Sequence, residues 1–221
     1  MKGTEVEFRF PLRDEKHARD FLSGLQFIRK ASQKDVYLDT ESGGLFRRGI
    51  FLRERNGRTL DFKFNLEDVE NRHEDCDEHS FSLPLSGKDA TGLANVCGKL
   101  GLRIPSAMDL EDFKRINGLR EFVIIDKVRE KFTDGEFTYC LDNVSGFGPF
   151  LEIESMATQG ADLESLKRRM MEKVSAFSPQ FMPTGYIELF VRQRDFNLYM
   201  KGRYLFEEDK RIRPDGKEFS P

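Results

Sequence analysis

The chain has 221 residues, 34% of them charged, and its formal net charge is only −3. This balance argues against a basic nucleic-acid-binding face, so we expect no nucleic-acid partner and charges of both signs sorted in space. The three cysteines lack CxxC spacing, which argues against a disulfide framework or a thiolate zinc site and favours a reducing cytoplasm. Because the sequence has neither an apolar run of about 18 residues nor a signal peptide, we expect no membrane partner.

The first predicted strand, residues 5–10, reads Glu-Val-Glu-Phe-Arg-Phe. Alternation along a strand puts Glu5, Glu7 and Arg9 on one face and the three apolar side chains on the other. Apolar residues at helical spacing within 14–24 predict a helix that packs on the apolar face. One face of this strand is therefore predicted to pack against a hydrophobic core, and the other to carry charged side chains.

Three further strands are predicted in the next part of the chain, at residues 35–40, 50–55 and 60–65. Arg53 and Arg55 lie on the same side of their strand, and Lys63 alternates with apolar neighbours. Asn56-Gly57, between the last two strands, is typical of a hairpin turn. Charged and apolar side chains are thus predicted to lie on opposite faces in each of these strands.

A polar loop at residues 66–73 precedes a strand whose register stays open. Glu74, Cys76 and Glu78 share one side of this strand, and the sequence does not decide which glutamate faces the ionic side. Apolar spacing then predicts helices at residues 88–102 and 109–116.

The second half of the chain is predicted to add three strands and two helices. The strands lie near residues 124–132, 137–142 and 151–154, and the helices at 162–177 and 184–201. The ionic side of these strands carries Lys127, Arg129, Lys131, Asp142, Glu152 and Glu154. We expect residues 1–202 to form one domain and residues 203–221 a charged tail.

The ionic faces together hold seven acidic and seven basic residues. They are Glu5, Glu7, Glu74, Glu78, Asp142, Glu152, Glu154, Arg9, Arg53, Arg55, Lys63, Lys127, Arg129 and Lys131. A merely solvated face would carry more Ser, Thr and Gln, because Glu, Lys and Asp are poor strand residues. We therefore predict an α+β fold in which about eight antiparallel strands close into a barrel, with helices packed outside and charges inside.

The chemistry of these charges points to a metal and a phosphate compound. Clustered Arg and Lys suit phosphate oxygens, whereas neighbouring carboxylates repel phosphate unless a divalent cation lies between them. The shortage of His and Cys on this face favours a hard ion, Mg²⁺ or Mn²⁺, over zinc. The structural alternative is a network of ion pairs that only joins strands, but such pairs seldom fill so many strands on one side.

Several motifs occur in a fixed order along the chain. They are Glu5-x-Glu7-x-Arg9, Tyr37-Leu38-Asp39-Thr40, Leu52-Arg53-Glu54-Arg55, Lys63, Lys127-Val128-Arg129, Leu141-Asp142 and Gly148-Pro149-Phe150-Leu151-Glu152-Ile153-Glu154. This order resembles the CYTH, or triphosphate tunnel metalloenzyme, superfamily, which includes thiamine and inorganic triphosphatases and class IV adenylyl cyclases. Arg9 stands where the family usually has lysine. The resemblance implies a closed eight-stranded tunnel in which basic residues hold a triphosphate and carboxylates hold metal.

The resemblance implies a triphosphatase that depends on Mg²⁺ or Mn²⁺ and acts on tripolyphosphate, thiamine triphosphate or ATP. The expected catalytic residues are Glu7, Asp142 and Arg129. The expected metal ligands are Glu5, Glu7, Glu78, Asp142, Glu152 and Glu154. The expected phosphate-binding residues are Arg9, Arg53, Arg55, Lys63, Lys127, Arg129 and Lys131.

Two other functions stay open at this point. A class IV adenylyl cyclase would use the same charges to convert ATP to cyclic AMP and pyrophosphate, although the His-Phe pair that some cyclases carry upstream of Glu5 is missing. A non-catalytic polyphosphate- or nucleotide-binding module would bind without turnover. The sequence also leaves the oligomeric state open, with a homodimer as one option.

Overall fold

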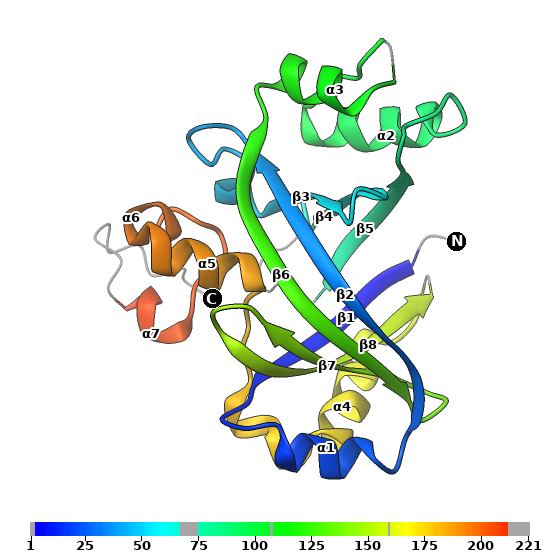
Figure 1. The fold of residues 1–221 in the computed structure, drawn as a ribbon, viewed down its shortest axis with the longest axis vertical. Coiled ribbons are helices and arrows are strands. Elements are labelled where there is room, and N and C mark those ends of the chain that lie inside the picture. The colour runs from blue at the N-terminus through cyan, green and yellow to red at the C-terminus, as the bar shows by residue number, and fades with distance from the viewer. Residues whose placement is uncertain (1–2, 67–74, 107, 159, 212–221) are drawn as a thin grey trace.

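The computed structural model describes residues 3–66, 75–106, 108–158 and 160–211 (Figure 1). Its eight strands form a closed antiparallel barrel in the order β1-β5-β4-β3-β2-β6-β7-β8, which confirms the predicted fold class. The strands are β1 (Gly3–Pro11), β2 (Gln26–Asp39), β3 (Ile50–Arg55), β4 (Thr59–Phe64), β5 (Asp75–Ser82), β6 (Arg120–Thr133), β7 (Thr138–Val144) and β8 (Gly148–Thr158).

Charged side chains point into the barrel and apolar side chains point out of it, as the alternation predicts. In β1, Val6, Phe8 and Phe10 are buried in an outer core, whereas the residues between them point into the barrel. Closure comes from the pairing of β1 with β8, in which Glu7 lies opposite Glu154. The pairing of the first and last strands, β1 and β8, therefore brings four charged side chains next to one another: Glu7, Arg9, Glu152 and Glu154.

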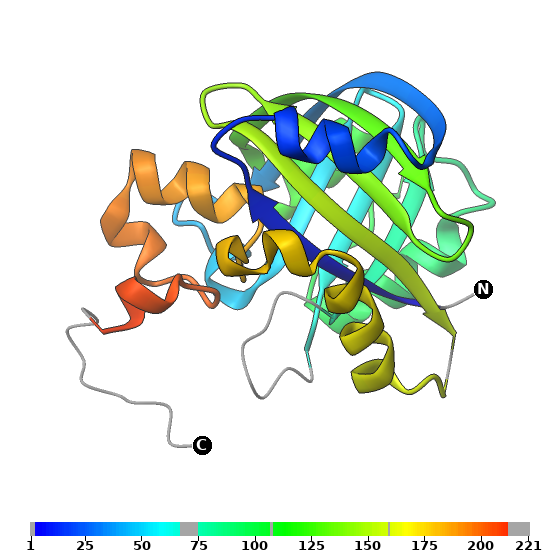
Figure 2. The same cartoon turned by 90° about the horizontal axis from the view of Figure 1, so that it is seen from below.

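Helices cover three parts of the barrel's outer surface. One group is α1 (Lys16–Leu22), α4 (Leu163–Lys173) and the 3-10 helix Ser175–Gln180, which pack on β1, β7 and β8 (Figure 2). A second group is α2 (Ala90–Leu100) and α3 (Leu110–Asn117), which pack on β3, β4 and β5. The third group is α5 (Tyr186–Arg194), α6 (Phe196–Tyr199) and α7 (Glu207–Lys210), which gather on one side of the barrel (Figure 1).

Local signals in the sequence account for several of the element ends. Asn56 and Gly57 have φ of 54° and 63°, the left-handed conformation that a tight hairpin between β3 and β4 requires. The carboxylates of Asp109 and Asp162 accept hydrogen bonds from backbone N–H groups in the first turns of α3 and α4, so each caps its helix. Gly101 ends α2 with φ of 72°.

Some boundaries differ from the predicted ones because tertiary contacts decide them. Strand β2 starts at Gln26 instead of residue 35, because its polar first half pairs with β6 along most of its length. The predicted helix 162–177 ends at Lys173 and continues as a 3-10 turn. The predicted helix 184–201 is interrupted at Asp195, whose side chain caps α6.

Residues 203–211 belong to the fold, although the sequence predicts a charged tail over 203–221; the rest of that predicted tail lies outside the described residues. Tyr204 and Leu205 are buried in the core that also holds α5. Asp209 accepts hydrogen bonds from Tyr199 and Arg192, so α7 is tied to the preceding helices. Helices long and apolar enough to cross a membrane are absent from the described part of the chain.

Candidate functional site

The barrel encloses a cavity of about 120 Å³ whose wall is mostly charged. Its lining comprises Glu5, Glu7, Arg9, Tyr37, Phe51, Arg53, Arg55, Lys63, Glu78, Lys127, Arg129, Lys131, Glu152, Glu154, Gly185, Tyr186 and Ile187. Twelve of the fourteen predicted ionic residues are therefore brought together. Of the other two, Asp142 lies outside this lining and Glu74 lies outside the described residues. Glu78 is the inward-facing glutamate of β5.

Lys63 lies among three carboxylates at one side of the cavity. Its Nζ is 2.8 Å from Glu7 Oε1, 3.0 Å from Glu5 Oε2 and 3.3 Å from Glu78 Oε1. Burial raises the pKa of Glu5 to about 8 despite the opposing effect of Lys63, and the like charges of Glu7 and Glu78 add to the rise. Glu5 is therefore largely protonated at neutral pH, so a further cation would bind this group with loss of that proton.

Arg9 connects β1 to β8 and to the segment before α5. Its Nε lies 2.5 Å from Glu152 Oε1, Nη2 donates to Glu7 Oε1 at 3.2 Å, and Nη1 donates to the Thr184 carbonyl at 2.7 Å. Its guanidinium also lies 4.2 Å from the ring centroid of Tyr186. These three acceptors lie in different directions, which suits the fork of a guanidinium better than the single charge of the usual lysine.

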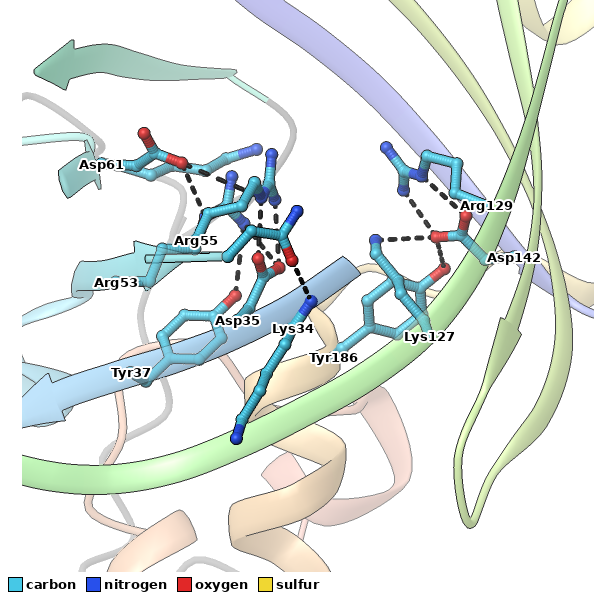
Figure 3. Close-up of polar contacts among 12 residues, drawn as sticks. Lys34, Asp35, Tyr37, Arg53, Arg55, Asp61, Lys127, Arg129, Asp142 and Tyr186 are labelled. Carbon is cyan, nitrogen blue, oxygen red and sulfur yellow. Dashed lines mark hydrogen bonds and ion pairs between the residues drawn. The ribbon is translucent and has the colours of Figure 1, made fainter. Parts of the chain in front are cut away.

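Asp142 is completely buried behind the cavity wall (Figure 3). Its carboxylate accepts hydrogen bonds from Lys127 Nζ at 2.8 Å, Arg129 Nε at 2.6 Å and Tyr186 Oη at 3.0 Å. Burial alone would raise its pKa, but Arg129 and Lys127 hold the pKa below its ordinary value. Because Asp142 lies outside the cavity lining and its oxygens accept from three donors, the geometry favours an anchoring role for Asp142 over the predicted metal ligation.

A second anchoring aspartate, Asp35, lies across the barrel (Figure 3). Arg55 donates to both of its carboxylate oxygens, at 2.7 and 3.0 Å, and Arg53 Nη1 is 3.6 Å from Oδ2. Arg53 Nε also donates to Asp61 Oδ2 at 3.3 Å. Sequence reasoning missed Asp35 and Asp61 as site residues, although Asp35 and Tyr37 alternate with apolar neighbours in the same way as the residues that it found.

The remaining pairs lie where β6, β7 and β8 meet. Lys131 contacts Glu154, and Arg129 contacts both Glu152 and Glu154. Each basic residue of the cavity therefore has a carboxylate within 4.0 Å in the ligand-free protein. A phosphate ligand has to replace carboxylates as the partner of these cations, and the released carboxylates then need a cation of their own.

The first turn of α5 forms part of the cavity wall, through Gly185, Tyr186 and Ile187. Glu188, the next residue, is fully buried, and its carboxylate has no side-chain hydrogen-bond partner within the described residues. Burial raises the pKa of Glu188 to about 7, although the backbone N–H groups of Glu188 and Gly185 and the nearby Arg9 and Lys63 lower it. The sequence places Glu188 in the predicted helix 184–201 and carries no signal that this residue is buried.

Comparison with known proteins gives one family match. The CYTH domain family model matches residues 3–186, so α6 and α7 lie beyond the matched residues. A Methanocaldococcus jannaschii protein named as a candidate adenylate cyclase is 23% identical over 190 residues, which cover 84% of this chain and 97% of that relative.

Solved structures share the barrel fold. A candidate adenylate cyclase of Vibrio parahaemolyticus has a TM-score of 0.57 at 17% identity, with 85% of this chain and 97% of that chain covered. A Hippeastrum protein, described as a candidate adenylyl cyclase that reveals a dominant triphosphatase activity, has a TM-score of 0.52 at 16% identity, with 93% and 98% covered. At these identities the likeness concerns the fold alone.

Proposed function

Because the chain belongs to the CYTH domain family, we propose that it is a metal-dependent triphosphatase that hydrolyses a linear triphosphate inside its barrel. The observation that carries this proposal is the enclosed wall in which basic side chains and carboxylates of β1, β3, β4, β5, β6 and β8 face one cavity. A polyanion and a divalent cation bound together would satisfy both signs of charge, whereas either alone would leave one sign unpaired.

The donor set fits a hard divalent cation. Carboxylate oxygens of Glu5, Glu7, Glu152 and Glu154 line the cavity, and oxygen donors of this kind suit Mg²⁺ and Mn²⁺. Glu78 adds a fifth carboxylate beside Lys63. When bound, such an ion supplies charge neutralisation on phosphate oxygens and lowers the pKa of a coordinated water.

The protein's own side chains would bind and orient the phosphate chain. Arg53 and Arg55 present guanidinium groups from β3, and Arg129 and Lys131 present a guanidinium and an ammonium group from β6 on another part of the wall. Charge-assisted hydrogen bonds from both groups would hold the phosphates in line and stabilise the negative charge that develops on the leaving pyrophosphate.

The buried aspartates would keep these cations in place before the substrate arrives. Asp142 fixes Arg129 and Lys127 from behind, and Asp35 fixes Arg55 in the same way. Such preorganisation lowers the entropy lost when the phosphate binds. Asp142 is therefore a positioning residue in this proposal, which replaces the metal-ligating and catalytic role expected from the sequence.

An adenylyl cyclase is the second candidate, and the names of the relatives favour it. A cyclase has to hold an adenine ring next to the triphosphate. The three aromatic residues of the cavity wall are already engaged: Tyr37 lies within hydrogen-bonding distance of Arg53, Tyr186 donates to Asp142, and Phe51 packs near Tyr204. Their engagement supports a triphosphatase over a cyclase.

Product analysis separates the two activities. We expect the protein with Mg²⁺ or Mn²⁺ to release orthophosphate from tripolyphosphate, thiamine triphosphate or ATP, and to make no cyclic AMP from ATP. Cyclic AMP with equimolar pyrophosphate would establish the cyclase instead. Tight binding of all three compounds without turnover, with either metal, would establish a binding module and exclude both enzymes.

A further inference from the structure

Cys140 lies where two of the cavity's glutamates meet. It is on β7, directly opposite Glu152 of β8 in the strand pairing, and Glu154 is the next residue on the same side of β8. The Cys140 sulfur and one carboxylate oxygen from each glutamate all lie within 4.8 Å of one another. Within the described residues this is the group of ligating side chains that comes closest together.

The Cys140 side chain has no other evident use at this position. It is completely buried and is not part of a disulfide. Within the described part of the chain, its sulfur has no hydrogen-bond partner. A buried polar atom aimed at two carboxylates is therefore available to a ligand that enters through the cavity, whose wall includes both glutamates.

The donor set differs in kind from the oxygen donors of the rest of the cavity. Zinc binds thiolate sulfur at about 2.3 Å and carboxylate oxygen at about 2.0–2.2 Å, so three ligands of one ion lie roughly 3–4 Å apart. The separation of these three atoms needs only small side-chain adjustments to match. Sulfur also favours zinc and similar ions over Mg²⁺, which prefers oxygen.

We propose that Cys140, Glu152 and Glu154 form a binding site for a thiophilic divalent cation of the zinc type, and that its occupation inhibits the protein. Binding replaces the thiol proton, which leaves to solvent, and forms one metal–sulfur and two metal–oxygen bonds. Arg9, Arg129 and Lys131, which pair with these glutamates in the ligand-free protein, would turn towards the cavity.

The inhibitory effect rests on the proposed triphosphatase function, whereas the binding does not. An ion at this site would occupy Glu152 and Glu154, two of the four carboxylates proposed to hold Mg²⁺. Zinc and Mg²⁺ would therefore compete, and zinc would act at concentrations far below those of Mg²⁺ because of the sulfur ligand. This site could not be predicted from the sequence, because strand pairing rather than CxxC spacing assembles it.

Cobalt(II) is the direct probe, because a cobalt–thiolate bond gives an intense charge-transfer absorption that oxygen ligands do not give. We expect Co²⁺ to produce this absorption in the wild-type protein and in Cys76→Ser, and not in Cys140→Ser. Cys76 is the matched control, since it is also a buried strand cysteine with no disulfide. Glu154→Gln, which keeps the thiol, should weaken Co²⁺ binding about 10- to 100-fold, the loss typical of a weakened metal site.

Absence of the charge-transfer band in the folded wild-type protein, or its persistence in Cys140→Ser, would overturn the proposed site. If Cys140→Ser does not fold, loss of affinity in folded Glu154→Gln carries the test, and unchanged affinity there refutes the site.

Zinc inhibition is then measured on tripolyphosphate hydrolysis. Its inhibition constant should rise at least about tenfold in Cys140→Ser relative to wild type, and stay unchanged in Cys76→Ser. Equal inhibition constants in wild type and Cys140→Ser would refute the inhibitory role. A protein that shows the cobalt band but hydrolyses no triphosphate would keep the metal site and reject the proposed function.

Discussion

Replacing Glu188 by Gln should remove a loss of stability that the wild-type protein shows as the pH rises from about 4.5 to 7. The pKa of this buried carboxyl is raised from its ordinary 4.5 to about 7, mainly because burial disfavours the charged form. At 1.36 kcal/mol per pH unit, this shift corresponds to roughly 3 kcal/mol of folding free energy. Gln has the same size and stays neutral, so it removes the cost of ionisation while it keeps the packing.

The sign of the effect follows from the direction of the shift. Below about pH 4.5 the carboxyl is neutral in both the folded and the unfolded chain, so it imposes no cost. As the pH rises towards 7, the unfolded chain ionises first and the folded state loses stability, and above 7 the loss is complete. The free energy of unfolding of Glu188→Gln relative to wild type should therefore rise by about 3 kcal/mol between pH 4 and pH 8.

Urea denaturation of both proteins across this pH range measures the difference. Glu172→Gln is a matched control, because Glu172 is exposed on α4, and it should follow the wild-type pH dependence. A parallel pH dependence in wild type and Glu188→Gln would refute the claim that Glu188 is buried as an unpaired carboxyl.

Three further predictions concern the charged wall. Arg53→Ala should weaken triphosphate binding by about 1.5–3 kcal/mol in a titration and leave the melting temperature nearly unchanged, because Asp35 keeps Arg55 as its partner; a large fall in melting temperature with unchanged affinity would contradict this. Asp142→Asn should lower the free energy of unfolding by about 3–5 kcal/mol, because two buried cations lose their shared counter-charge, and unchanged stability in urea would count against the anchoring role. Mg²⁺ should bind more tightly by calorimetry when a non-hydrolysable tripolyphosphate analogue is present, because phosphate releases the carboxylates; equal Mg²⁺ affinities would reject the exchange of partners.

The barrel could be predicted from the sequence because its signal is repeated and local. Alternation in Glu5–Phe10 fixes which side chains face inward, and the Asn56-Gly57 turn fixes the register of β3 against β4. The alternation left Glu74 and Glu78 as alternatives for the inward-facing glutamate, and the structure places Glu78 in the cavity wall. This alternation is a reliable guide to the folded strand, because a shift of the strand pairing by one residue would turn every buried apolar side chain to the other face.

Other features depend on contacts between distant parts of the chain. Glu188 lies in an ordinary amphipathic helix, and only the packing of α5 on the barrel makes it buried. Asp142 alternates with apolar neighbours as the predicted metal ligands do, and only the folded structure shows that Lys127, Arg129 and Tyr186 already donate to its oxygens. Cys140 gained its neighbours from strand pairing. Sequence pattern therefore predicts which face a residue occupies better than it predicts its partner.

The dependence of triphosphate hydrolysis on metal and on Glu7 tests the central claim most directly. Glu7 lies between Lys63 and Arg9 in the cavity, so Glu7→Gln removes one charge and one ligand without changing the size of the side chain. Orthophosphate release from tripolyphosphate is measured for both proteins with Mg²⁺, and for the wild type also in EDTA. We predict turnover only for the wild type with Mg²⁺, while Glu7→Gln stays folded. Full wild-type turnover in EDTA, or in Glu7→Gln, would contradict a metal-dependent reaction inside this barrel.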